Sequence, residues 1–135
     1  MNLDKLQKEI DNIKEKTEEL RSLILQFKKI IILGNGGSNA IANHISVDYT
    51  KFLKIPTTTL SNSSMLTAYT NDYGQDIAYK QFLSEFYTPD TLVILISSSG
   101  NSLNIINAAT YCLNNDIKFI TLSGFDKNNK LNNMN

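Results

Sequence analysis

The sequence predicts an α/β fold, in which a parallel β-sheet with helices between its strands follows one long helix. Three short and largely apolar runs support this prediction, at residues 29–33, 92–96 and 118–122, and each has the length of a buried strand. Segments with a helical pattern, about 10 to 15 residues long, separate the strands. This alternation is typical of parallel sheets joined by right-handed crossovers.

The long helix is expected from residue 2 to about residue 28. Its apolar residues recur at alternating three- and four-residue steps, as on one face of a helix; they are Leu3, Leu6, Ile10, Ile13, Leu20, Ile24 and Phe27. Such a regular stripe suits packing against the helix of a second subunit. It equally suits a helix that covers its own domain, and the sequence leaves both alternatives open. We therefore predict a helical segment, 1–28, and one domain, 29–135.

The rest of the chain continues the alternation of strand and helix. Pro56 lacks a backbone N–H, so a strand that contains it is expected to begin there or to lie at an edge. The further expected elements are a helix at 38–52, a strand at 55–60, a short helix at 65–70 with a turn at 71–74, helices at 77–86 and 102–114, and a loop-like or frayed tail at 126–135.

Composition narrows the class of protein. The 135 residues include 13 basic and 13 acidic side chains, a balance that favours neither nucleic acid nor an anionic membrane as a partner. Cys112 is the single cysteine, so no internal disulfide is expected. No apolar stretch reaches the roughly 18 residues of a membrane span, and the first residues lack the apolar segment of a secretory signal. The sequence predicts a cytoplasmic protein.

Two loops rich in glycine and serine follow predicted strands and precede predicted helices. The first is Gly-Asn-Gly-Gly-Ser at 34–38, and the second is Ser-Ser-Ser-Gly-Asn-Ser at 97–102. A strand-to-helix junction presents unpaired N–H groups and the positive end of a helix dipole, which together favour an anion. Ser102 also suits a helix N-cap, a role compatible with phosphate binding. Two such loops in one domain predict a phosphorylated ligand.

Other chemistries fit these loops poorly. The first loop lacks the Gly-Lys-Ser/Thr ending of a P-loop, and its sixth residue, Asn39, departs from G-x-G-x-x-G. Nucleotide binding is therefore a poor second choice. The serines lack a G-x-S-x-G context or an adjacent base, so a serine hydrolase is not expected.

His44 and Asp48 lie four residues apart on the predicted helix 38–52, so both side chains face one side of it. Such a pair can share a proton, act as a general base or supply two ligands to a metal such as zinc, which takes three or four. The alternative is a surface hydrogen bond without a catalytic role. Asn35 suits either turn geometry or a bond to a substrate hydroxyl, and Asp72 is expected as a turn residue.

Five segments, in order, resemble the sugar isomerase (SIS) domain family and, more narrowly, its phosphoheptose isomerase branch. They are residues 34–38, 44–48, 66–74, 96–102 and 120–124. The resemblance implies a doubly wound, flavodoxin-like α/β domain, assembled as a homotetramer through the first helix. It also implies phosphorylated sugars as substrates, in pathways to the heptoses of lipopolysaccharide or capsule.

The resemblance further implies roles for individual residues. Asp48 would be the base that moves a proton between adjacent sugar carbons through an enediolate, and His44 would lie beside a metal or the substrate. Asp72 would lie near the substrate. The residues implied to bind substrate or phosphate are Asn35, Gly36, Gly37, Ser38, Ser97, Ser98, Ser99 and Ser102.

The sequence departs from the family pattern in two ways. The family base is usually Glu, and Asp48 is one methylene shorter, a difference that can misplace a catalytic group. The chain ends at Asn135, without counterparts to the family's last strand and the helix that carries its catalytic histidine. We expect a shortened piece of an isomerase. The alternatives are a protein that has kept the pocket and lost the chemistry, binding sugar phosphates without turnover, and a subunit-interaction protein.

Overall fold

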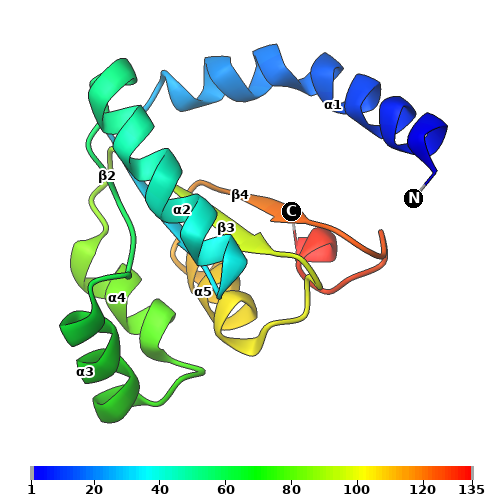
Figure 1. Ribbon diagram of the computed structural model, residues 1–135. Coiled ribbons are helices and arrows are strands. Elements are labelled where there is room, and N and C mark those ends of the chain that lie inside the picture. The colour runs from blue at the N-terminus through cyan, green and yellow to red at the C-terminus, as the bar shows by residue number, and fades with distance from the viewer. Residues whose placement is uncertain (1, 135) are drawn as a thin grey trace.

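A four-stranded parallel sheet forms the centre of the computed structural model, which describes residues 2–134 (Figure 1). Its strands are β1 (Lys29–Gly34), β2 (Thr57–Thr58), β3 (Thr91–Ser97) and β4 (Phe119–Ser123). Its helices are α1 (Leu3–Ile24), α2 (Gly37–Asp48), α3 (Ser63–Tyr73), α4 (Ala78–Phe86) and α5 (Leu103–Asn114), with a π-helical turn η1 (Tyr49–Leu53) and a 3-10 turn η2 (Asn132–Met134).

The strand order is β2-β1-β3-β4, and every pairing is parallel. This confirms the predicted α/β fold with a parallel sheet. The first crossover leads from β1 to β2 on one side, and the next leads to β3 on the other, so the order reverses between β1 and β3. Their carboxyl ends lie side by side, with Gly34 opposite Ile96. In open α/β sheets, ligands bind at such a switch point.

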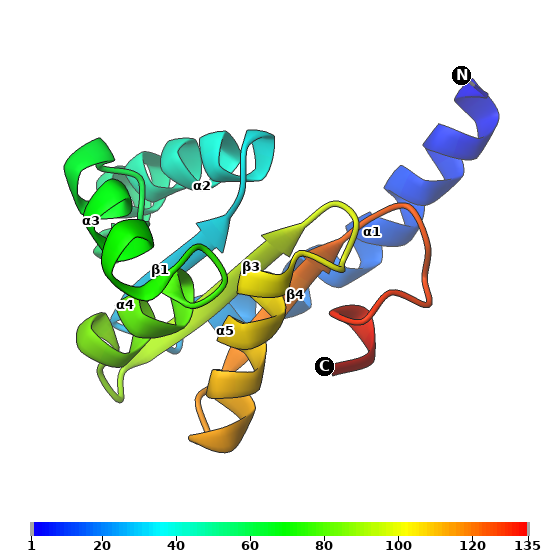
Figure 2. The ribbon, with the colours of Figure 1, turned by 90° about the horizontal axis from the view of Figure 1, so that it is seen from below.

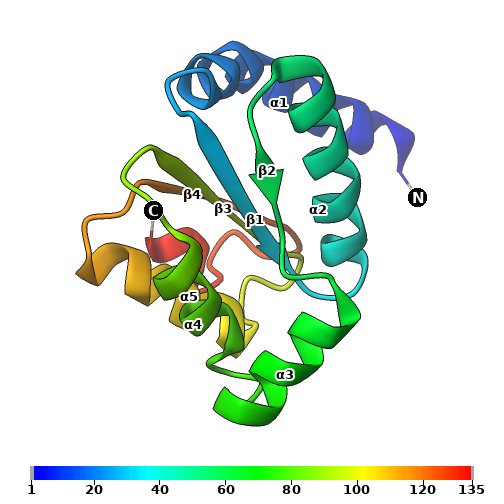
Figure 3. The same ribbon diagram turned by 90° about the vertical axis from the view of Figure 1, so that its left-hand side faces the viewer.

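Alternate strand residues face two separate apolar clusters. Ile30 and Ile32 of β1 pack with residues of α1 and α2, whereas Ile31 and Leu33 pack with residues of α4 and α5. Figure 3 shows the sheet between these two pairs of helices. Burial on both faces is the reason that β1 and β3 are continuous apolar runs rather than alternating ones.

The first helix ends at Ile24 rather than near residue 28 as predicted. The chain leaves the helix because the backbone N–H groups of Lys28 and Lys29 both donate to the carbonyl of Asp90, at 3.0 and 3.2 Å. Phe27 continues the apolar periodicity and packs on the sheet, but it does so from the connection into β1. Apolar spacing therefore overestimates the helix by one turn.

The prediction for residues 65–74 is also wrong in part, because the short helix and the turn are one helix, α3. Asn62 caps it at the start, where its side chain accepts a hydrogen bond from the Met65 N–H at 3.1 Å. Gly74, with φ of 82°, ends it. Asp72 is thus a helical residue, not a turn residue. The strand expected at 55–60 shortens to two residues at the sheet edge, after Pro56.

The C-terminal segment is not the frayed loop that its polar composition predicts. Leu131 is fully buried in the α4–α5 cluster, and Asn129 is buried as well. The Leu131 N–H donates to the Gly100 carbonyl at 2.9 Å, which ties the segment to the loop after β3. Figure 2 shows this red segment returning beside that loop.

Candidate anion-binding site

The loops that follow β1 and β3 meet at a hollow of about 220 Å³ at the carboxyl edge of the sheet. We call residues 34–38 the glycine loop and residues 97–102 the serine loop. Six of the eight lining residues carry a hydroxyl or an amide, and none of the lining side chains is charged. The hollow is lined by Asn35, Ser38, Ile96, Ser97, Ser98, Ser99, Ser102 and Phe125.

The glycine loop packs directly against the first turn of α2. A Cβ atom on Gly34 would lie 2.9 Å from the backbone carbon of Ser38, so a larger residue does not fit there. Gly36 precedes the helix with φ of 52°, a conformation that favours glycine. The buried Tyr79 hydroxyl donates to the Gly34 carbonyl at 2.5 Å. Burial raises the pKa of Tyr79, so the hydroxyl keeps its proton for this bond.

A reciprocal amide pair joins the glycine loop to α5. The side-chain NH₂ of Asn35 donates to the side-chain carbonyl of Asn104, and Asn104 donates back, both at 2.9 Å. Asn104 is buried, and its role was not predicted from the sequence. The signal was an amide in the first turn of a mostly apolar helix, one that needs a buried partner. Asn35 therefore has a structural bond in addition to its place on the hollow.

The serine loop turns sharply at Gly100, with φ of 65°, and the Gly100 N–H donates to the Ser97 carbonyl at 3.0 Å. The Ser97 hydroxyl donates to that of Ser102 at 3.1 Å. Ser102 occupies the N-cap position of α5, as predicted, but its side chain makes no capping bond. Asn104 instead accepts the Ile105 N–H with its side-chain oxygen at 2.9 Å. The dipole of α5 favours an anion at the hollow.

The segment after β4 supports the serine loop from outside. The Gly124 N–H donates to the Ser98 carbonyl at 3.0 Å. Asn129 fills the space beside Gly100, where a Cβ atom would lie 1.9 Å from its side-chain oxygen. Neither Asn129 nor the pocket-lining Phe125 was predicted. Asn129 falls in the tail at 126–135, which was expected to be loop-like or frayed, and Phe125 lies just before that tail.

The structure places the proposed acid–base pair outside this hollow. The Nε2 atom of His44 lies 3.5 Å from an Asp48 carboxylate oxygen, and their side chains are 82% and 44% exposed on α2. Asp72 lies on α3, where it accepts a hydrogen bond from the Asn71 side chain at 3.0 Å. Thus the structure brings together Asn35, Ser38 and the four serines. It does not bring His44, Asp48, Asp72, Gly36 or Gly37 into the lining.

The residues described here do not complete a zinc site. Within residues 2–134 no group of three or more His, Cys, Asp and Glu side chains lies close enough to hold a metal ion. His44 and Asp48 supply two ligands, and zinc takes at least three from protein.

No helix in the described part of the chain has the length and apolar character needed to cross a bilayer.

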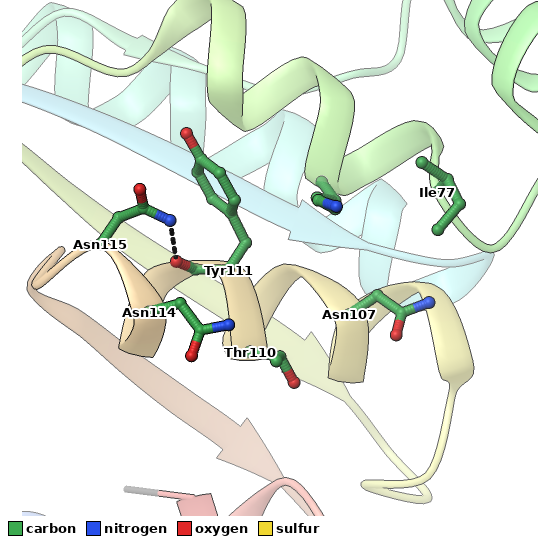
Figure 4. A pocket seen from close by; sticks show the side chains of 7 residues that line it. Ile77, Asn107, Thr110, Tyr111, Asn114 and Asn115 are labelled. Atoms are coloured by element: carbon green, nitrogen blue, oxygen red, sulfur yellow. Dashed lines mark hydrogen bonds between the residues drawn. The ribbon is translucent and has the colours of Figure 1, made fainter.

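A second hollow, of about 370 Å³, lies between α4 and α5 (Figure 4). It is larger than the first, but it runs along helix flanks rather than at the strand ends where α/β proteins bind ligands. Two of its amides bond to backbone carbonyls, Asn115 to Tyr111 and Asn107 to Asp76. We therefore place the candidate site at the smaller hollow.

Comparison with known proteins gives the class of this fold and site. The model of the SIS domain matches residues 2–124. The chain therefore belongs to the SIS domain family.

Several similar proteins carry a name more specific than that of the family. The phosphoheptose isomerase of Buchnera aphidicola subsp. Acyrthosiphon pisum (strain Tuc7) is 33% identical over 122 residues, covering 87% of this chain and 63% of that protein. The phosphoheptose isomerase of Shewanella denitrificans is 34% identical over 122 residues, covering 86% and 62%. The structure of phosphoheptose isomerase GmhA from Neisseria gonorrhoeae matches with a TM-score of 0.83 and 30% identity, covering 98% of this chain and 75% of that one. The chain thus spans less than two thirds of the length of the two relatives from Buchnera and Shewanella.

Proposed function

We propose that this protein is an aldose–ketose isomerase whose substrate is sedoheptulose 7-phosphate or a related phosphosugar. The observation that carries the proposal is the hollow of serine hydroxyls at the start of α5, where the glycine loop joins it. The resemblance to proteins named phosphoheptose isomerase supports the same substrate class. Synthesis of lipopolysaccharide or capsule heptoses is the pathway that this substrate would serve.

The serine loop suits the phosphate end of the substrate. Hydroxyls donate hydrogen bonds to phosphate oxygens without adding charge, and the start of α5 contributes a favourable dipole. Because no lysine or arginine lines the hollow, binding would rest on short-range hydrogen bonds. Such bonds are less sensitive to salt than an exposed ion pair.

The proton transfer would take place at the other end of the sugar. Asp48 follows Ser38 by ten residues on α2, which corresponds to about 15 Å of helix rise. A seven-carbon sugar phosphate is extended, and the carbons that exchange the proton lie farthest from its phosphate. Asp48 would remove the proton from C1 to give the enediolate and return it to C2, while a second proton passes from the C1 hydroxyl to the C2 oxygen. His44, 3.5 Å from Asp48, would orient the carboxylate.

Exposed apolar residues on α1 support a homo-oligomer. Leu3 and Ile13 are each 66% exposed, and Leu6 and Ile10 are exposed as well, whereas the packing on the sheet involves only the last turns of the helix. Figure 1 shows α1 extending beyond the sheet. This favours the first of the two alternatives for the helix, a contact with another copy, and a tetramer is the arrangement that the family suggests. A cytoplasmic location stays a prediction.

A second candidate function is sugar-phosphate binding without catalysis. The exposure of His44 and Asp48 outside the hollow favours it. The two functions share the serine loop and differ in what Asp48 does.

Proton exchange from solvent separates the two candidates. The protein is incubated with sedoheptulose 7-phosphate in D₂O, and NMR follows deuterium entering the sugar at C1 together with formation of the aldose. An isomerase exchanges the proton, and Asp48→Asn lowers the rate at least about 100-fold. Asp90→Asn, an exposed carboxylate paired with Lys28 at the opposite edge of the sheet, is the control and keeps the rate. Binding without exchange would instead establish the non-catalytic function.

A further inference from the structure

Phe125 combines two unfavourable features at the edge of the hollow. Its side chain is 91% exposed, the highest value among the large apolar residues exposed in the described chain. Its φ is 59°, in the left-handed region that bulky residues rarely adopt. Phe125 is nevertheless one of the residues that line the hollow, together with the serine loop. The exposed ring adds nothing to the apolar core, and the positive φ is unfavourable, so the fold alone does not account for Phe125.

In the described chain, two other non-glycine residues have a positive φ, and both have ordinary explanations. Lys54 is the C-cap of η1, and Asp116 follows the C-cap of α5. Helices commonly end with a left-handed residue at these positions. Phe125 follows a strand and Gly124, with no helix to end.

The chain is fixed on both sides of Phe125. On one side the Gly124 N–H donates to the Ser98 carbonyl at 3.0 Å. On the other side the Asn129 side chain donates to the Asp126 carbonyl at 2.7 Å, and the same amide ties this segment to the end of β4 by donating to the Ser123 hydroxyl at 3.0 Å. Surroundings that fix a strained residue in this way are typical of functional positions.

We propose that the Phe125 ring packs on the carbon chain of a sugar phosphate whose phosphate is held by the serine loop, and so determines specificity for sugar phosphates over inorganic phosphate. This rests on the proposed function of that loop. A sugar presents C–H groups on one face, and an aromatic ring covers such a face while its own apolar surface leaves water. Ligand binding would then bury the ring, which the protein alone leaves exposed.

Calorimetric titration of two ligands tests the proposal. Inorganic phosphate reports on the serine loop alone, and sedoheptulose 7-phosphate reports on the loop and the ring together. We expect Phe125→Ala to weaken the sugar phosphate about 10-fold, the upper range of an aromatic contact, and to leave inorganic phosphate unchanged. Phe125→Tyr, which keeps the ring, should restore the wild-type affinity. Unchanged phosphate binding also shows that the variant is folded.

A fluorescent variant gives an independent readout, since the sequence contains no tryptophan. In Phe125→Trp the emission should shift to shorter wavelength when sedoheptulose 7-phosphate binds, because the indole leaves water. Leu113→Trp is the matched control. Leu113 is exposed in the last turn of α5, at the other end of that helix from the serine loop, and its emission should not respond.

The outcomes distinguish this proposal from the function on which it rests. If wild-type protein binds neither ligand, the phosphate site and the role of Phe125 both fail. If it binds sugar phosphate and Phe125→Ala binds it equally well, only the role of Phe125 fails. If Phe125→Ala weakens both ligands equally, or if light scattering shows that it dissociates an oligomer, the ring is structural or a subunit contact, and the proposal is wrong.

Discussion

The glycine loop is held by side chains on helices that cover the sheet, whereas the serine loop is held by a segment near the end of the chain, whose Asn129 and Leu131 are buried. Tyr79 and Asn104, which bond to the glycine loop, lie on helices that pack against the sheet. The serine loop instead contacts Asn129 and Leu131, contributed by the last residues described. One hollow is thus built from two loops with different kinds of support.

This difference has a consequence for stability and binding. A change at the support of the glycine loop disturbs buried packing, so it should lower the free energy of unfolding of the whole domain. A change at the support of the serine loop disturbs contacts near the chain end, so it should act mainly on the loop and on phosphate affinity. Segments near a chain end open locally at less cost than the central strands and helices.

Gly34→Ala should have the largest effect on stability. The added methyl would lie 2.8 and 2.9 Å from the Cβ and backbone carbon of Ser38, and the start of α2 would have to move. We expect the free energy of unfolding to fall by about 3 kcal/mol, measured by urea denaturation. Gly37→Ala, which has open space around it, is the control and should stay within about 1 kcal/mol of wild type. Equal stability of the two variants would contradict the close packing of this loop.

Asn104→Ala should have the next largest effect. It removes both bonds of the amide pair and leaves the Asn35 amide without its partner, at a loss of about 2 kcal/mol in the free energy of unfolding. In the double variant with Asn35→Ala the losses should not add, because each single change already breaks the same pair. Full additivity in urea denaturation would show that the two amides act independently.

The sequence could predict the fold and the chemistry of the loops, because both depend on local patterns. Apolar runs identify β1 and β3, and the glycine and serine content identifies the loops at their ends. The supports of those loops could not be predicted in the same way. Asn104 and Asn129 matter through partners far along the chain or through the space they fill, and composition does not reveal such contacts.

Helix limits show the same distinction. The predicted helix at 77–86 nearly coincides with α4, where apolar spacing and burial agree. α1 ends early because Lys28 and Lys29 bond to Asp90, more than 60 residues away. α3 runs on through Asp72 because Asn62 caps its start and Gly74 ends it. Long-range bonds and caps, rather than periodicity, decided these boundaries.

Gly100 and Asn129 test the support of the serine loop. Gly100→Ala places a methyl 1.9 Å from the Asn129 side-chain oxygen, in addition to the strain of a positive φ. In an Asn129→Gly background all the clashing side-chain atoms are gone, including the Cβ atom at 2.6 Å, and only the strain remains. We expect a coupling free energy of about 1.5 kcal/mol between the two changes in urea denaturation. A coupling near zero would mean that the segment moves aside freely and does not support the loop.

Tyr79→Phe should have the smallest effect and a characteristic pH dependence. It removes the bond to the Gly34 carbonyl, at a loss of about 1 kcal/mol. Burial raises the pKa of Tyr79 in the folded protein above its usual value of 10.0, so the hydroxyl ionises more readily in the unfolded chain. Its contribution is therefore complete below pH 10 and is lost as the pH rises toward the folded-state pKa. Urea denaturation from pH 8 to 11 should show wild type approaching Tyr79→Phe above pH 10. Tyr111→Phe, a half-buried residue of α5 that lines the second hollow away from the glycine loop, is the control and should keep the wild-type profile (Figure 4). Parallel profiles for wild type and Tyr79→Phe would show that this hydroxyl does not hold the glycine loop.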